Sequence, residues 1–275
     1  MRTIQTFFLC ALLATGFGSF SRASDSTNQI THAVANWTPP QNPNPSKILE
    51  EAEADAKAGN YANALAKHIW FYENALNYNS GLYGVRLSFA LSDWVELGKA
   101  YPPALEKLKA LRDEAEKNVR VDKKVRDSFV DFAAINGYLK DEAKTDDFFV
   151  WLDSNKPDAA KEIFDEARPA LIKSKNYQLC GKYIKPESFF DEALNLYREN
   201  MQLSKKPKFD NGRLQAFARK KFVNDTATLI ALLVVNDRKK EAKQIVDRIS
   251  EEPDLPEFKA EIEKALTGEV PPPWP

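Results

Sequence analysis

Few residues of this chain have the chemistry for acid–base, nucleophilic or metal catalysis. The 275 residues include two histidines, His32 and His68, and two cysteines, Cys10 and Cys180. His32 belongs to a proline-rich segment, and His68 occupies a predicted helix position that suits large packing residues. We therefore expect a packing histidine with satisfied hydrogen bonds there, rather than a ligand or a base. No zinc-type histidine and cysteine spacing, glycine-rich phosphate loop, calcium loop or serine-nucleophile elbow is present. The sequence therefore predicts no catalytic residue, no cofactor and no metal site.

The remaining candidates for catalysis are the thiol and the carboxylates. A reactive cysteine needs exposure and a lowered pKa, whereas Cys180 stands where a small residue lets two helices approach closely. The acid pairs Glu50–Glu51 and Asp146–Asp147 are adjacent in the chain. Adjacent residues of a helix point apart, so neither pair forms a matched acid and base. We therefore expect a protein that is not an enzyme.

The elements that would position these side chains are helices. Ala, Leu, Glu and Lys are plentiful, glycine is low and strand-like alternation is scarce, which favours an all-α fold. The clearest unit is Leu82–Lys117, interpreted as two antiparallel helices. Its first arm, Leu82–Gly98, carries two apolar rows, which is typical of a helix between two neighbours, and Gly98 is expected to close it. Pro102 and Pro103 then start the second arm, because proline fits the first turn of a helix. On the solvent side of this arm, Arg112 is expected to pair with Glu116 and Asp113 with Lys117, since the members of each pair are four residues apart. The two rows are Leu82, Val85 and Phe89, and Leu87, Leu91 and Trp94.

Weaker copies of this unit lie on both sides. One spans Lys47–Asn77 around the turn at Gly59, a third runs from about Asp122 to Asn155, and a fourth leads from Phe164 to Ile184. Lys205–Gly212 is interpreted as a polar loop. Further helices are predicted over Glu187–Ser204, after this loop up to Val235, and over Arg238–Ser250 and Leu255–Leu266. Small residues recur where the two helices of each unit would cross: Ala64, Ala104, Thr145 and Cys180.

This pattern resembles the tetratricopeptide repeat (TPR) family. The matching positions are Leu91, Ser92 and Val95 in the first helix, and Tyr101, Ala104, Leu108 and Leu111 in the turn and second helix. The crossing residues are 40, 41 and 35 positions apart, against about 34 in the family, so the units carry insertions or longer helices. The resemblance implies a TPR-like α-solenoid, an array of antiparallel helical hairpins that binds a peptide or protein segment in its concave face.

The two ends of the chain differ in composition from the helical region. Arg2 precedes the apolar stretch Phe7–Phe17, and Ser21-Arg22-Ala23 has small residues at the usual cleavage spacing, so residues 1–23 are predicted to be a secretory signal peptide. A membrane anchor would need about twenty apolar residues. We therefore expect an exported protein, periplasmic or secreted.

The predicted domain organisation follows from these ends. Residues 24–46 are a proline-rich leader, residues 47–268 the TPR-like domain, and residues 269–275 a proline-rich tail. Trp37 of the leader either docks on the domain or stays in a flexible segment, and the flexible alternative is preferred.

Charge narrows the range of partners. Without residues 1–23 the chain has 37 basic and 40 acidic residues, a net charge of −3, and one cysteine. Nucleic acid is therefore not expected as a partner, no internal disulfide can form, and no remaining apolar run is long enough for a transmembrane helix. Lys205–Lys221 holds seven basic residues and one acid, whereas Glu251–Pro275 holds seven acids and two lysines. We interpret these as solvated faces that partly neutralise each other; the alternative is a basic surface for an anionic partner or a membrane.

The predicted binding surface is the strip along the first helices of the array. It contains Arg86, Asp93 and Glu96, and a run of three consecutive aromatic residues adds Trp70 and Tyr72, because such a run cannot face one core throughout. We therefore predict a non-catalytic protein-binding or assembly module. One alternative is an enzyme or carbohydrate-processing factor on a helical scaffold, since aromatic side chains stack on sugars. Another is a structural stabiliser of an envelope complex.

Overall fold

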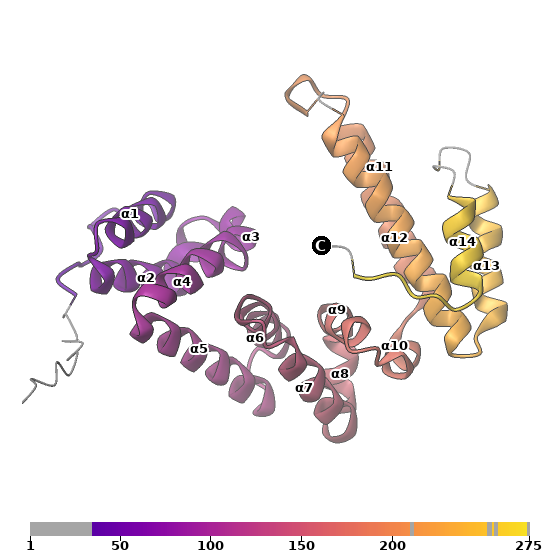
Figure 1. The fold of residues 1–275 in the computed structure, drawn as a ribbon, viewed down its shortest axis with the longest axis horizontal. Helices are drawn as coiled ribbons and strands as arrows, with labels where there is room; N and C mark the ends of the chain where they lie inside the picture. The colour runs from indigo at the N-terminus through magenta and orange to yellow at the C-terminus, as the bar shows by residue number, and fades with distance from the viewer. Residues whose placement is uncertain (1–34, 210–211, 252–254, 256–257, 274–275) are drawn as a thin grey trace, which may run out of the picture. The chain divides into compact units, whose positions relative to one another are not determined.

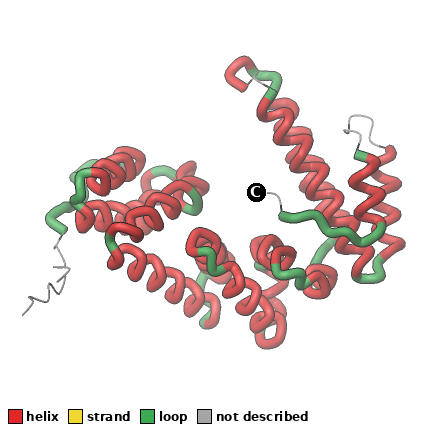
Figure 2. The backbone as a smooth tube through the Cα atoms, viewed as in Figure 1, coloured by secondary structure: helices red, strands yellow, loops and turns green. Residues whose placement is uncertain are grey.

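The computed structural model describes residues 35–209, 212–251, 255 and 258–273. These residues form fourteen α-helices and two short 3-10 helices, and none of them lies in a strand (Figures 1 and 2). The predicted all-α class is confirmed. The predicted signal peptide, residues 1–23, lies outside the described residues, as does the first part of the leader.

The α-helices are α1 (Pro45–Lys57), α2 (Tyr61–Tyr78), α3 (Tyr83–Arg86), α4 (Phe89–Ala100), α5 (Pro102–Arg120), α6 (Val125–Leu139), α7 (Glu142–Asn155), α8 (Pro157–Glu162), α9 (Phe164–Lys173), α10 (Tyr177–Tyr183), α11 (Pro186–Leu203), α12 (Arg213–Val235), α13 (Lys239–Glu251) and α14 (Lys259–Leu266). The 3-10 helices are η1 (Ser80–Leu82) and η2 (Pro207–Phe209).

Local signals set the start of α1 and the turn into α2. The side chain of Asn44 accepts a hydrogen bond from the backbone N–H of Lys47, which satisfies one of the free donors at the start of α1. Gly59 then adopts a φ of +81°, a left-handed conformation that costs glycine little. The turn predicted at Gly59 is confirmed.

Trp37 packs against α2, contrary to the flexible alternative preferred from the sequence. Its ring centroid lies 6.4 Å from that of Trp70 in an edge-to-face arrangement. The backbone N–H of Asn36 also donates to Oδ1 of Asn63 over 2.9 Å. Aromatic contact and a hydrogen bond together hold this part of the leader on the helix.

The predicted first arm, Leu82–Gly98, is not one helix. The turn η1 leads into the four-residue α3, and α4 begins only at Phe89. Between them Ser88 has φ −130° and ψ −92°, outside the helical region, and its Oγ donates to the carbonyl of Gly84 over 2.6 Å. A serine side chain that bonds a carbonyl four residues earlier favours bending of a helix, which is consistent with this break.

The break changes which side chains are buried. Phe89, expected in an apolar row, is 71 % exposed, whereas Trp94 is buried and its indole N–H donates to the carbonyl of Ala104 on α5 over 2.9 Å. Gly98 does not end the arm in the left-handed conformation but lies within α4. A Cβ on Gly98 would lie 3.1 Å from Cβ of Leu105, so the glycine allows α4 and α5 to approach closely.

Consecutive helices pack against one another along the chain. α2 contacts α1 and α4, α5 contacts α4 and α6, and α7 contacts α6, α8 and α9. The small residues predicted at helix crossings are all buried: Ala64, Ala104, Thr145 and Cys180. Their predicted burial is therefore confirmed.

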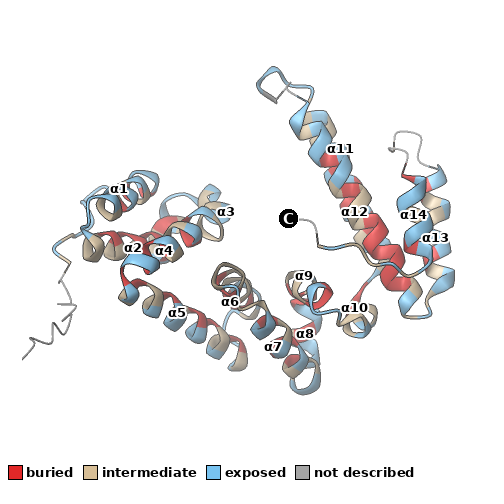
Figure 3. Cartoon of the chain, in the orientation of Figure 1, coloured by how far each residue is buried: buried red, intermediate tan, exposed pale blue. Residues whose placement is uncertain are grey.

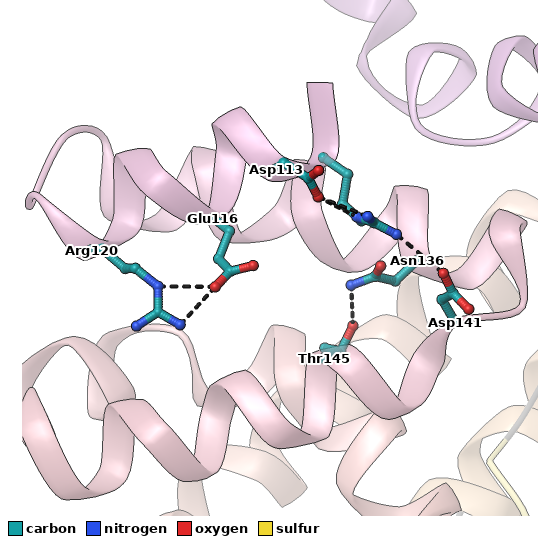
Figure 4. A network of polar contacts seen from close by, with 7 residues as sticks. Asp113, Glu116, Arg120, Asn136, Asp141 and Thr145 are labelled. Carbon is teal, nitrogen blue, oxygen red and sulfur yellow. Dashed lines mark hydrogen bonds and ion pairs between the residues drawn. The ribbon is translucent and has the colours of Figure 1, made fainter. Parts of the chain in front are cut away.

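A buried hydrogen bond joins α6 to α7 (Figure 4). Asn136 is fully buried, and its Nδ2 donates to Oγ1 of Thr145 over 3.1 Å. Its Oδ1 is buried without a hydrogen-bond partner. The single Nδ2 bond therefore compensates part of the cost of burying this amide.

An ion pair also connects α5 to the start of α7. Arg112, predicted to face solvent beside Glu116, is buried, and its guanidinium donates to Asp113 and to Asp141. Glu116 pairs instead with Arg120 over 2.6 Å (Figure 4). The predicted pairing of Arg112 with Glu116 is wrong, because Arg112 forms ion pairs with Asp113 and with Asp141, which is distant in sequence.

In the C-terminal part α12 is the central helix. Residues 226–233 are all buried (Figure 3), because α10, α11, α13 and α14 pack around them. This burial on every side explains why Leu229–Val235 is the longest apolar run of the chain after the signal-like segment. The tail returns along α12, where Nδ2 of Asn224 donates to the carbonyl of Pro272 over 3.1 Å. None of the helices described here is both long and apolar enough to cross a membrane.

Candidate functional site

Two of the predicted binding residues, Asp93 and Glu96, meet in one pocket between α1, α2 and α4. We call it the acidic pocket. Its volume is about 290 Å³. The lining residues are Glu53, Ala56 and Lys57 of α1, Tyr61 and His68 of α2, and Asp93, Glu96, Leu97 and Ala100 of α4.

His68 lies at the deep side of this pocket. The residue is 2 % exposed, and its ring stacks on that of Trp94 at a centroid distance of 5.6 Å. The predicted packing role is confirmed, but the expected satisfaction of its hydrogen bonds is not. Burial lowers the pKa of His68 to about 4, which keeps the imidazole neutral at neutral pH. Nδ1 is buried without a partner, and the ring makes no hydrogen bond to any described residue. A buried polar group without a partner is costly.

The three carboxylates of the pocket differ in their partners. Glu53 pairs with Lys57 over 2.5 Å, and Glu96 pairs with Lys99 over 2.5 Å. Asp93 forms no ion pair or hydrogen bond with a described residue. Burial, and then the charge of Glu53, raise the pKa of Asp93, while Lys57 lowers it. Among the described residues, Asp93 is therefore the carboxylate of the acidic pocket without an ion-pair partner.

Arg86 and Tyr72 are committed to a different cluster. Nη1 and Nη2 of Arg86 donate to the two carboxylate oxygens of Asp131 on α6 over 2.6 and 2.8 Å. Its Nε donates to the carbonyl of Tyr72 over 2.8 Å, and its guanidinium lies 3.8 Å from the Tyr72 ring centroid. Burial, and then the charge of Asp131, raise the pKa of Tyr72. This cluster joins α2, α3 and α6, and neither residue lines the acidic pocket.

Trp70 lies outside both the acidic pocket and the Arg86 cluster, and packs with Trp37 and Tyr78 in an aromatic group. Its ring lies 6.4 Å from that of Trp37 and 5.7 Å from that of Tyr78. Trp70 is half-buried, whereas Tyr78 is 56 % exposed. The prediction that the aromatic run Trp70 to Tyr72 is not wholly buried is therefore confirmed at Trp70.

The basic segment Lys205–Lys221 lies partly beside acidic residues of the C-terminal region. Arg219 and Lys220 line a pocket of about 590 Å³ together with Glu261 and Glu269. This placement agrees with two faces that partly neutralise each other.

The structure gives little support to Cys180 as a nucleophile or to a metal site among the described residues. Cys180 is buried, and burial raises its pKa to about 12, so its thiol stays protonated at neutral pH. Within the described ranges no cluster of histidine, cysteine, aspartate and glutamate has the geometry to hold a metal ion.

Sequence reasoning missed Glu53 and Tyr61 as neighbours of Asp93. Nothing in the sequence distinguishes Glu53 from the other exposed acids of α1. The turn at Gly59 places Tyr61 at the start of α2. The turn does not indicate which side chains of other helices lie beside Tyr61. Only the packing of α1 and α4 on α2 brings these side chains together.

Comparisons with known proteins give no match to this chain among family models, curated proteins or solved structures.

Proposed function

We propose that this chain is an exported, non-catalytic module that binds a segment of a partner protein at the acidic pocket, within a TPR-like array of helical hairpins. The signal-like pattern of residues 1–23 supports export. Contacts between successive helices, with small residues buried at the predicted crossings, support a TPR-like array.

The proposal depends on one observation, that Asp93 lines the acidic pocket without an ion-pair or hydrogen-bond partner among the described residues. Its carboxylate has no described partner, lies in a pocket with apolar walls, and stands beside a buried histidine that also has none. A buried polar group such as Nδ1 of His68 is usually satisfied within a protein, whereas Asp93 beside it is partly exposed. Altered pKa values, such as those of Asp93 and His68, are common at functional sites. No serine, threonine or cysteine lines the pocket, which favours binding over nucleophilic catalysis.

Affinity capture from an exported fraction tests the proposal. The mature chain, its Asp93→Asn variant and a Glu106→Gln control serve as baits. Glu106 is exposed on α5 and forms no ion pair with a described residue, so its variant removes the same charge elsewhere. We expect one partner to be recovered with the wild type and the control and lost with Asp93→Asn, whose helical circular dichroism stays unchanged. Equal recovery with all three baits, or no recovery at all, would refute the proposal.

The aromatic group favours a second candidate, a carbohydrate-processing or carbohydrate-binding factor. Trp37, Trp70 and Tyr78 form a partly exposed set of adjoining rings, which suits stacking on a sugar. If this candidate is correct, oligosaccharides will change the tryptophan fluorescence of the wild type and leave that of Trp70→Ala unchanged. Binding of the oligosaccharides by neither protein would remove this candidate.

A further inference from the structure

We infer that the acidic pocket recognises an arginine side chain of the partner segment. The inference rests on the proposed function and names the chemical group that the pocket binds.

The charge of the pocket selects a cation. Glu53 and Glu96 already have lysine partners, so their charges are largely balanced within the protein. Asp93 has no such partner, and it lies near Glu53 in partly desolvated surroundings. A cationic group bound at Asp93 would satisfy this carboxylate, whereas an anionic group would face three carboxylates and a single lysine, Lys57.

The buried histidine is a second, independent sign of a ligand. His68 is a polar side chain almost wholly removed from solvent, it lines the pocket, and it has no hydrogen-bond partner among the described residues. A neutral imidazole carries one nitrogen that accepts a hydrogen bond. A ligand with several N–H donors can therefore bond both to Asp93 and to His68.

The walls favour guanidinium over ammonium. The pocket presents two rings, Tyr61 and His68, together with apolar side chains such as that of Leu97. A guanidinium is planar, stacks on rings, is less strongly hydrated than an ammonium and has five N–H donors in a fork that fits a carboxylate.

This chain already places its own guanidinium groups over aromatic rings. Arg86 lies 3.8 Å from the ring centroid of Tyr72, and Arg120 lies 4.0 Å from that of Trp151. Arg86 also binds Asp131 through two parallel hydrogen bonds. An arginine at Asp93 would combine the same two interactions.

Nuclear magnetic resonance titration of the mature protein at neutral pH tests the inference. The probes are blocked alanine hexapeptides that contain one arginine, one lysine or one citrulline, the neutral isostere of arginine. We expect the arginine peptide to shift the His68 ring signals and to bind about tenfold or more tightly than the citrulline peptide, as a charged hydrogen bond is lost with citrulline. The lysine peptide should bind with intermediate affinity. Asp93→Asn should lose the preference for arginine, and Glu106→Gln should keep it.

Three results would overturn the inference. These are equal binding of arginine and citrulline peptides, lysine binding as tight as arginine binding, and no shift of the His68 signals with any peptide. None of them decides the proposed function, which the capture experiment judges separately. A captured partner that depends on Asp93 but binds through a segment without arginine would refute the inference and leave the function standing.

Discussion

Arg86 and Asp93 are charged residues of neighbouring helices with opposite surroundings. Arg86 is largely buried, bonded to both carboxylate oxygens of Asp131 and to a backbone carbonyl. Asp93 has no described partner and faces a pocket. We therefore expect Arg86 to contribute to the stability of the fold, and we propose Asp93 as the binding residue.

Replacing Arg86 by alanine should destabilise the protein strongly. The change leaves Asp131 and the Tyr72 carbonyl without their donors in a partly buried place, and we expect the free energy of unfolding to fall by about 2–3 kcal/mol, somewhat less than for a fully buried pair. Urea unfolding measures the loss. The control is Lys243→Ala, which breaks an exposed pair with Asp247 and should cost at most about 0.5 kcal/mol. Equal losses for the two variants would show that the Arg86 pair contributes little in solution.

His68 should make the protein less stable in acid. Its pKa falls from 6.5 in the unfolded chain to about 4 in the fold. Between these values the unfolded chain binds the extra proton, so stability decreases as the pH falls, by about 3 kcal/mol in total.

The matched variant for this effect is His68→Phe, which keeps a ring beside Trp94 and removes the titrating group. Unfolding free energies of both proteins are measured from pH 7 to pH 4, and the carboxylates titrate in each. The wild type should lose about 3 kcal/mol more than the variant over this range. Parallel curves would mean that His68 titrates normally in the fold.

At the scale of elements, two glycines within helices have different reasons to be there. Gly181 of α10 lies directly against the side chain of Asn236, whose Nδ2 donates to the carbonyls of Tyr177 and Leu232. Gly137 of α6 has open space where a Cβ would stand. The first glycine therefore serves the contact between α10 and the end of α12, and the second serves no contact with a neighbour.

Alanine at these two positions should act in opposite directions. Gly137→Ala should stabilise the protein by up to about 1 kcal/mol, because alanine restricts the unfolded chain and favours the helix. Gly181→Ala should destabilise it despite the same helical gain, because the new methyl group displaces Asn236. Thermal unfolding of both variants measures the effect. A stabilised Gly181→Ala variant would contradict the close approach of α10 and Asn236.

At the scale of the described molecule, the buried apolar residues fall into separate clusters. One joins α2, α4, α5 and the C-terminal part of α6, and includes Leu91, Trp94 and Leu108. A larger one extends from the end of α5 to α14 and includes Phe132 and Leu233. Most helix contacts are between near neighbours in the chain. Regions of such a protein can open separately.

Leu91→Ala should therefore destabilise one region more than another. Deleting this buried side chain costs about 2–5 kcal/mol, and the loss should appear as faster hydrogen exchange in α2, α4 and α5. Exchange in α12, which lies in the other cluster, should change little. Equal acceleration in both regions would show that the chain unfolds as one cooperative unit.

Features that depend on neighbouring residues could be predicted from the sequence. Helical periodicity and composition predicted the all-α class, Pro102 and Pro103 marked the start of α5, and Gly59 marked a turn. Small residues predicted burial at Ala104 and Cys180, which the structure confirms. These signals are local, because a turn, a helix start or an apolar row requires only the residues within a few positions.

Contacts between side chains that are distant in the sequence could not be predicted in this way. Arg86 bonds to Asp131, which lies 45 positions later in the chain. Arg86 was predicted to belong to the binding strip, and this contact leaves its side chain largely buried. The break at Ser88 changes the face on which Phe89 lies. The acidic pocket requires three helices to pack before Glu53, His68 and Asp93 share it. Such contacts depend on the energies of packing and ion pairing between distant segments, and no periodicity within one segment records them.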